Sequence, residues 1–132
     1  MGVFADLSGS FDYEIVDEFM DHYEIMNAAL QPAILALDKP EEYAGRINEL
    51  FRIFHNLKSA SAYLKLEAIN RLSAFVEDVL ERARGREGPA TAPFIDWLLK
   101  VADQFDSWYN DLSHDHTRFT ALDFSIFDLP VE

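Results

Sequence analysis

Four stretches of helical periodicity, joined by short connections, constrain the fold of this 132-residue chain more than any other feature. Apolar residues recur at spacings of three and four in segments expected at about 12–37, 41–64, 67–84 and 93–112. This spacing places the apolar side chains on one face of each helix, and that face must be buried. Because the connections are short, the pattern predicts an all-α fold, an antiparallel up-down-up-down four-helix bundle.

The first segment contains a proline within its helical pattern. Its buried stripe is expected to comprise Ile15, Phe19, Tyr23, Met26, Leu30, Ile34 and Leu37. Ser10 or Asp12 could cap its start. Pro32 is expected to kink the helix or split it in two, because proline has no N–H group to donate to the preceding turn.

The last twenty residues are rich in apolar side chains but lack a regular period. The apolar residues are Phe119, Leu122, Phe124, Ile126, Phe127 and Leu129. This segment is expected either to fold back onto the bundle or to be a linker. We therefore expect two parts, a bundle domain at 1–112 and a C-terminal tail or linker at 113–132.

Charge and composition argue against several classes of function. Lys and Arg number 11 against 24 Asp and Glu, a formal charge of −13, so the surface repels nucleic acid and anionic lipid. Cysteine is absent, which excludes disulfides and thiolate zinc sites. No apolar run approaches the roughly 18–20 residues that span a bilayer. Residues 1–10 lack the features of a signal peptide, so we expect a cytoplasmic protein without nucleic-acid or membrane partners.

One histidine lies beside the expected buried stripe of the second segment. Because each helical residue turns the chain by about 100°, His55 points about that far away from Phe54, the core direction. The same lateral strip holds Arg52, Ser59 and Ala62. A neutral imidazole is nucleophilic near pH 7, and Lys58 at i+3 can offset the roughly −1.5 to −2 charges of a phosphoryl group. The geometry suits a phosphoryl acceptor, although a histidine at a helix flank is more often an ordinary surface residue.

The residues around His55 resemble the motif of histidine phosphotransfer (HPt) domains, His-x-Leu-Lys-Gly followed by small residues and Leu-Gly. The matching residues are His55, Leu57, Lys58, Ala60, Ser61, Ala62 and Leu64. The chain is similar in particular to the N-terminal phosphotransfer domain of chemotaxis-type histidine kinases. Residues 47–52 resemble the Ile-Asn-x-Ile-Phe-Arg run of those kinases, and Glu77 followed by Ala83-Arg84 resembles their downstream helix. The likeness covers about residues 12–112.

This resemblance implies a phosphoryl carrier that is not a self-contained enzyme and needs no cofactor or metal of its own. His55 would accept a phosphoryl group from the ATP-binding domain of a histidine kinase, with Mg in that partner, or from a phosphorylated receiver. It would pass the group to the aspartate of a response-regulator receiver domain. Lys58 would support the phosphoryl group, and Glu77 would help to orient His55. Ser59 is a further candidate site residue from its own chemistry, because its hydroxyl could hydrogen-bond the phosphoryl group. The expected docking residues are Arg52, Ser59, Ala62 and Lys65.

Three positions depart from the family pattern. Ser59 replaces the usual Gly, which adds bulk and a hydroxyl group at the docking surface. Lys65 replaces the second Gly, so the helix end is expected to differ or to carry an added positive charge. Ala74 occupies the place of a second histidine in chemotaxis kinases. We therefore expect a broken relay in which Glu77 has no route to His55, and a less tightly oriented His55.

Two other functions stay open. The departures at Ser59, Lys65 and Ala74 suit a non-catalytic helical adaptor that binds receiver domains without being phosphorylated. The weaker alternative is a bundle that binds a divalent metal near the end of the fourth helix. Its candidate ligands are Asp111, His114, Asp115 and His116.

Overall fold

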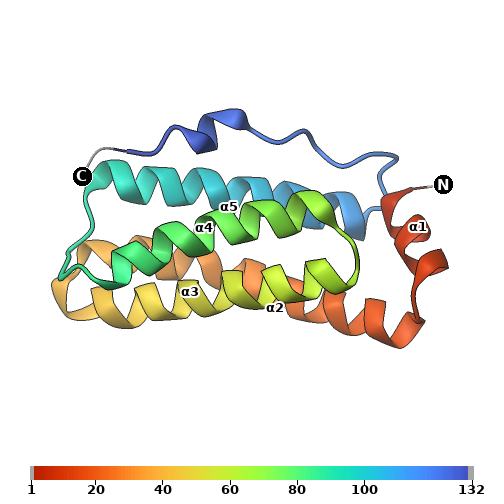
Figure 1. Cartoon of the computed structure of the whole chain (residues 1–132), viewed down its shortest axis with the longest axis horizontal. Coiled ribbons are helices and arrows are strands. Elements are labelled where there is room, and N and C mark those ends of the chain that lie inside the picture. The colour runs from red at the N-terminus through yellow and green to blue at the C-terminus, as the bar shows by residue number, and fades with distance from the viewer. Residues whose placement is uncertain (1, 131–132) are drawn as a thin grey trace.

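The computed structural model describes residues 2–130, and every regular element within them is helical. The elements are α1 (Val3–Ser10), α2 (Tyr13–Leu35), η1 (Ala36–Asp38), α3 (Pro40–Tyr63), α4 (Glu67–Arg84), α5 (Ala92–Ser113) and η2 (Phe124–Phe127). Figure 1 shows α2 to α5 side by side, with the chain reversing direction at each connection and α1 across one end. The all-α prediction is confirmed. None of the described helices has the length and apolarity needed to cross a membrane.

The core lies between the four long helices and is rich in aromatic side chains. The rings of Phe54 and Phe105 meet edge to face with centroids 5.2 Å apart, and both side chains are buried. The hydroxyl of the fully buried Tyr23 donates to the carbonyl of Phe105 at 2.6 Å, which ties α2 to α5. Each buried side chain of this size contributes roughly 1.5–3 kcal/mol. These contacts hold both α2 and α3 against α5.

Pro32 does not divide α2, so the expected split is wrong. The α-helix continues through Pro32 to Leu35, and the tighter η1 turn follows. The carbonyl that loses its helical partner belongs to Ala28, and both Ala28 and Pro32 are exposed. Water can satisfy the carbonyl oxygen there, so the proline is tolerated.

The start of α2 corrects the expected buried stripe. Ile15 is 37% exposed, whereas Val16 is fully buried. Val16, Phe19 and Tyr23 follow the spacing i, i+3, i+7 and form the buried face of the first turns. The stripe therefore begins one residue later than the sequence pattern indicated.

The short helix α1 was not predicted. Its first turn is held by Asp115, whose Oδ1 accepts hydrogen bonds from the backbone N–H groups of Phe4 and Ala5, both at 3.0 Å. A helix of eight residues is marginal by itself in water, so tertiary contacts decide whether it forms.

The C-terminal segment lies along α5 (Figure 1). The indole N–H of Trp108 donates to the carbonyl of Thr120 at 2.9 Å, and that of Trp97 donates to the carbonyl of Ile126 at 2.7 Å. Ile126 is fully buried. The segment thus provides the hydrogen-bond acceptors for the indole N–H groups of two buried tryptophans on α5. The division into a bundle at 1–112 and a tail at 113–132 stays a prediction.

Candidate functional site

His55 lies on the edge of α3 that borders α4. Its side chain is 54% exposed, and its Nδ1 lies 2.9 Å from Oε2 of Glu77 on α4. The other carboxylate oxygen of Glu77 accepts a hydrogen bond from Nζ of Lys58 at 2.7 Å. Glu77 itself is only 12% exposed. A single, nearly buried carboxylate therefore holds an imidazole and an ammonium group.

Helical spacing and the pairing of α3 with α4 bring these groups together. His55 and Lys58 are three residues apart and share one edge of α3. The side-chain amide of Asn70 donates to the carbonyl of Lys58 at 2.8 Å. At the other end of the helix pair, the hydroxyl of Tyr43 donates to the carbonyl of Ala83 at 3.0 Å. These two bonds set the register that places Glu77 beside His55.

The charge on Glu77 determines which imidazole nitrogen carries the proton. Burial of the carboxyl group acts to raise the pKa of Glu77, but the hydrogen bonds from Lys58 and His55 outweigh it, and the pKa lies below its ordinary value of 4.5. Glu77 is therefore ionised at neutral pH and can only accept hydrogen bonds. Nδ1 of His55 must donate, so the neutral ring keeps its lone pair on Nε2.

The expected break in the relay at Ala74 is wrong. Glu77 contacts His55 directly, without a second histidine between them. Ala74 lies one turn before Glu77 on α4 and is partly exposed. A glutamate side chain is long enough to cross from α4 to α3 at this point. The expectation of a loosely oriented His55 rested on that break and loses its basis.

The predicted docking residues are all at the surface. Arg52, Ser59, Ala62 and Lys65 are exposed. Lys65 follows α3 with a φ of 58°, a conformation that favours glycine. The N–H of Lys65 donates to Ala62 at 3.2 Å and that of Leu66 donates to Ser61 at 2.9 Å, which is a Schellman ending. The expectation of an altered helix end is wrong, because Lys65 ends the helix as a glycine would.

The carboxylates named as alternative metal ligands are bound to groups of the chain itself. Asp111 accepts hydrogen bonds from the backbone N–H of Thr120 at 2.5 Å and pairs with Nδ1 of His116 at 2.7 Å. Asp115 caps the start of α1. Among residues 2–130, no three His, Asp or Glu side chains are grouped so that they could hold a metal ion. Nothing in this part of the chain favours the metal-binding alternative.

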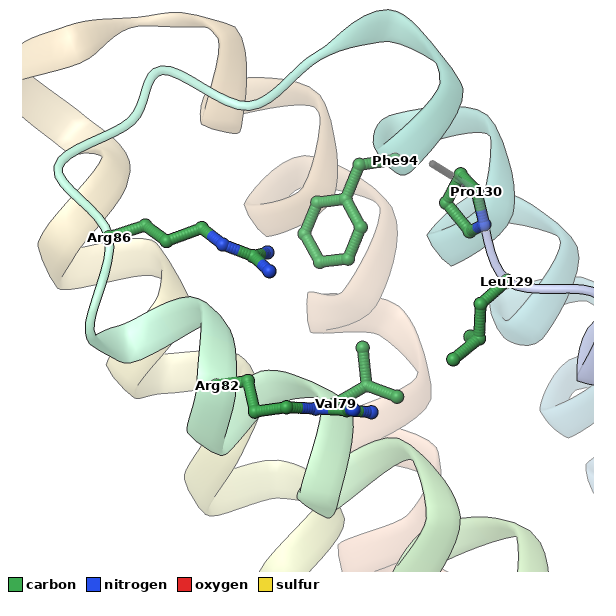
Figure 2. Close-up of a pocket in the computed structure, with 6 residues that line it drawn as sticks. All are labelled: Val79, Arg82, Arg86, Phe94, Leu129 and Pro130. Carbon is green, nitrogen blue, oxygen red and sulfur yellow. The ribbon is translucent and has the colours of Figure 1, made fainter. Parts of the chain in front are cut away.

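Two concave surfaces differ in their position relative to His55. A pocket of about 190 Å³ lies where the end of α4 meets the start of α5, and it contains none of the predicted site residues (Figure 2). It is lined by Val79, Arg82, Arg86, Phe94, Leu129 and Pro130. A groove of about 430 Å³ runs between α2 and α3, and Asn56, the neighbour of His55, lines it. The other lining residues of this groove are Phe19, His22, Ile25, Met26 and Ala60.

The sequence interpretation missed the contact of Phe51 with His55, the contact of Arg84 with Phe51, and the groove that Asn56 lines. The ring of Phe51 is parallel to the imidazole, and the guanidinium of Arg84 lies over the ring of Phe51. The spacing of Phe51 from His55, i−4, was a usable signal for the first contact. Ile25 is 67% exposed, and an apolar residue outside the buried stripe was the signal for the groove.

The fold and the site together define a helical module in which a half-exposed imidazole on α3 is paired with a carboxylate on α4. Comparison with protein families identifies that module. The model of the Hpt domain matches residues 14–113, and the chain belongs to this family of histidine phosphotransfer modules of two-component signalling.

Curated relatives include a sensor histidine kinase and several chemotaxis proteins. The chain is 32% identical over 90 residues to the sensor histidine kinase CheAY of Helicobacter pylori, an alignment that covers 68% of this chain and 11% of the kinase. It is 22% identical over 114 residues to the chemotaxis protein CheA of Listeria monocytogenes, covering 86% and 18%. For CheA of Bacillus subtilis the identity is 26% over 92 residues, covering 70% and 13%. The chain thus spans less than a fifth of these relatives. No solved structure matches it significantly.

Proposed function

We propose that this chain carries a phosphoryl group on Nε2 of His55, with α2 to α5 serving as an antiparallel four-helix scaffold. The hydrogen bond between Nδ1 and Glu77 carries this proposal, because it leaves the lone pair of the ring on Nε2. Membership of the Hpt family supports the same assignment.

Loading and unloading of His55 are displacements at phosphorus. In loading, the Nε2 lone pair attacks the phosphoryl group of ATP in a kinase domain or of an aspartyl phosphate in a receiver domain. The N–P bond forms, and the P–O bond breaks with its electron pair on ADP or on the aspartate. In unloading, a carboxylate oxygen of a receiver aspartate attacks phosphorus, and the N–P electron pair returns to Nε2. The Nδ1–H of His55 donates to Glu77 throughout.

Lys58 supplies the positive charge beside the phosphoryl group. Its ammonium pairs with Glu77 at 2.7 Å, and its side chain is 33% exposed. An ammonium group has three donors, so Lys58 can keep its bond to Glu77 and also reach a phosphoryl oxygen. It thereby offsets part of the roughly −1.5 to −2 charges that phosphorylation adds.

We assign the exposed face around His55 to the receiver domain as its docking surface. Ser59 and Ala62 are small and exposed, so a partner's active site has room to reach the ring. Arg52 and Lys65 are the charged docking residues in this proposal, and the largely apolar groove between α2 and α3 begins at Asn56, the neighbour of His55. Desolvation of such an apolar surface is the main source of binding free energy in protein association.

The test compares His55→Gln with His116→Gln as a matched control. The two histidine side chains are 54% and 52% exposed, and each pairs with one carboxylate. Each variant is incubated with potassium phosphoramidate and, separately, with ATP and the kinase domain of a CheA relative. We expect one acid-labile phosphoryl group on the wild type and on His116→Gln, and none on His55→Gln, by intact mass. Equal labelling of the wild type and His55→Gln would overturn the proposal.

The second candidate is a receiver-binding adaptor that is not phosphorylated. Ser59 and Lys65 favour it, because both add side-chain bulk where the HPt motif has glycine. Binding of a receiver domain in calorimetry, combined with no acid-labile phosphate on any histidine, would select this candidate.

A further inference from the structure

Paired side-chain strips on α3 and α4 extend the site beyond Glu77 and Lys58. On α3, Phe51, His55 and Lys58 follow the spacing i, i+4, i+7, which places them on one edge. On α4, Glu77 and Arg84 are also seven residues apart. Because the two helices run in opposite directions, Glu77 meets His55 and Lys58, while Arg84 meets Phe51.

Phe51 provides a flat surface beside the imidazole of His55. The two ring centroids are 6.2 Å apart and the ring planes differ by only 13°. Offset parallel pairs of aromatic rings have centroids roughly 4.5–7 Å apart. Phe51 is partly buried and packs on the core, so it is less free to move than the exposed ring that it faces.

Arg84 holds Phe51 from the opposite helix. Its guanidinium carbon lies 4.5 Å from the centroid of the Phe51 ring, within the range of a cation–π contact. Nη1 of Arg84 also donates to Glu81, one turn earlier on α4, at 3.0 Å. The guanidinium therefore has two partners, the face of the Phe51 ring and the carboxylate of Glu81.

One hydrogen bond cannot orient the imidazole completely. A carboxylate oxygen accepts hydrogen bonds over a broad range of angles, and the torsion about Cβ–Cγ of histidine is broad, so the ring can still tilt about Cβ–Cγ, which carries Nδ1 away from Glu77. The lone pair of Nε2 lies in the ring plane, so a tilt turns it away from an incoming phosphorus atom. A parallel ring beside the imidazole restricts this tilt and so keeps the bond from Nδ1–H to Glu77 formed.

We infer that Phe51 is a positioning residue that sets the ring plane of His55, and that Arg84 holds Phe51 in place from α4. This inference rests on the proposed function of His55. It assigns two contacts to the orientation of one nucleophile, with Glu77 holding the edge of the ring and Phe51 its plane. Alignment of this kind contributes to rate because the reacting orbitals must meet within a narrow range of angles.

The experiment compares Phe51→Leu with Phe51→Tyr and with Phe75→Leu as a control. Leucine fills most of the ring's volume without a flat face, whereas tyrosine keeps the face. Phe75 is a partly buried phenylalanine that packs against Trp97 and Phe127, away from His55. Each protein is labelled with ¹⁵N-histidine to measure the tautomers of His55 by NMR, and phosphorylation by phosphoramidate is followed by mass.

We expect His55 of the wild type, Phe51→Tyr and Phe75→Leu to be almost entirely the Nδ1–H tautomer. Phe51→Leu should contain a mixture of tautomers and take up phosphate more slowly, by a factor on the order of three to ten. Arg84→Gln, which leaves the core volume unchanged, should show the same changes to a smaller degree. A merely structural role for Phe51 would lower stability without changing the tautomer.

Unchanged tautomers and rates in folded Phe51→Leu and Arg84→Gln would overturn the inference. The tautomer measurement does not depend on phosphorylation. If wild-type His55 accepts no phosphate, the proposed function fails, and the NMR comparison still decides whether Phe51 orients the ring.

Discussion

Two histidine–carboxylate pairs in this protein have similar geometry and different surroundings. His55 and Glu77 join α3 to α4 at 2.9 Å, and His116 and Asp111 join the segment after α5 to α5 itself at 2.7 Å. In each pair the histidine is about half exposed and the carboxylate is nearly buried, at 12% and 6% exposed. In each, hydrogen bonds lower the pKa of the carboxyl group against the opposing effect of burial.

The difference lies in what shares the carboxylate. The second partner of Glu77 is the ammonium group of Lys58, a charge on a flexible side chain. The second partner of Asp111 is the backbone N–H of Thr120, which is fixed in the chain. At the His55–Glu77 pair, the ammonium group of Lys58 can therefore move toward an added negative charge. At the His116–Asp111 pair, the carboxylate instead closes the loop that follows α5. A histidine–carboxylate contact therefore indicates function only together with the other groups that bind the same carboxylate.

The largest expected effect separates the two carboxylates by stability. Asp111→Asn removes the ionised acceptor from the backbone N–H group of Thr120, in a partly buried hydrogen bond, and from His116. We expect it to lower the free energy of unfolding by about 1–3 kcal/mol. Glu77→Gln should cost less than about 1 kcal/mol, because Lys58 and His55 can turn to water. Urea denaturation measures both. Equal losses would contradict a structural role restricted to Asp111.

Lys58→Ala is expected to slow phosphoryl transfer on the order of tenfold, the equivalent of about 1.4 kcal/mol, because the charge beside the phosphoryl group is lost. Stability should change little, since the side chain is one-third exposed. The measurement is the rate of transfer from labelled His55 to a receiver domain, with Lys100→Ala as the control lysine on α5. An unchanged rate would remove Lys58 from the site.

The dependence of stability on pH should have the same sign at both pairs. Because the folded state lowers the pKa of Glu77 and Asp111, each carboxylate adds stability above its ordinary value, 4.5 and 3.8 respectively. That contribution is lost as the pH falls through the folded pKa. The difference in unfolding free energy between wild type and Glu77→Gln or Asp111→Asn should shrink toward zero in acid, from about pH 6 to pH 2. A difference that grows on acidification would contradict the lowered pKa values.

The smallest effect concerns the two residues with positive φ that end α3 and α5. Lys65 has a φ of 58° and Asp115 a φ of 50°. Lys65→Gly should raise stability by about 0.5–1 kcal/mol, because glycine adopts this conformation without strain. Asp115→Gly should instead lower it by about 1 kcal/mol, since Asp115 also caps α1. Thermal denaturation at one pH distinguishes the two signs.

Sequence periodicity predicted the long helices because each buried face repeats locally. It also placed Lys58 beside His55, since both lie on one helix. It could not predict the contact of Glu77 with His55, which depends on the distance between two helices and on the length of one side chain. The contact of Arg84 with Phe51 has the same origin. Helix α1 was missed because its cap, Asp115, lies about 110 residues away along the chain.

The distant capping of α1 has a kinetic consequence. The N–H of Val3 donates to the carbonyl of His116 at 2.8 Å, and Asp115 caps the same turn, so these bonds close a loop of most of the chain. Closing such a loop is entropically costly until the intervening helices have packed. We therefore expect α1 to form last and to open independently of the other helices, with amide hydrogens that exchange at a lower opening free energy than those of α3.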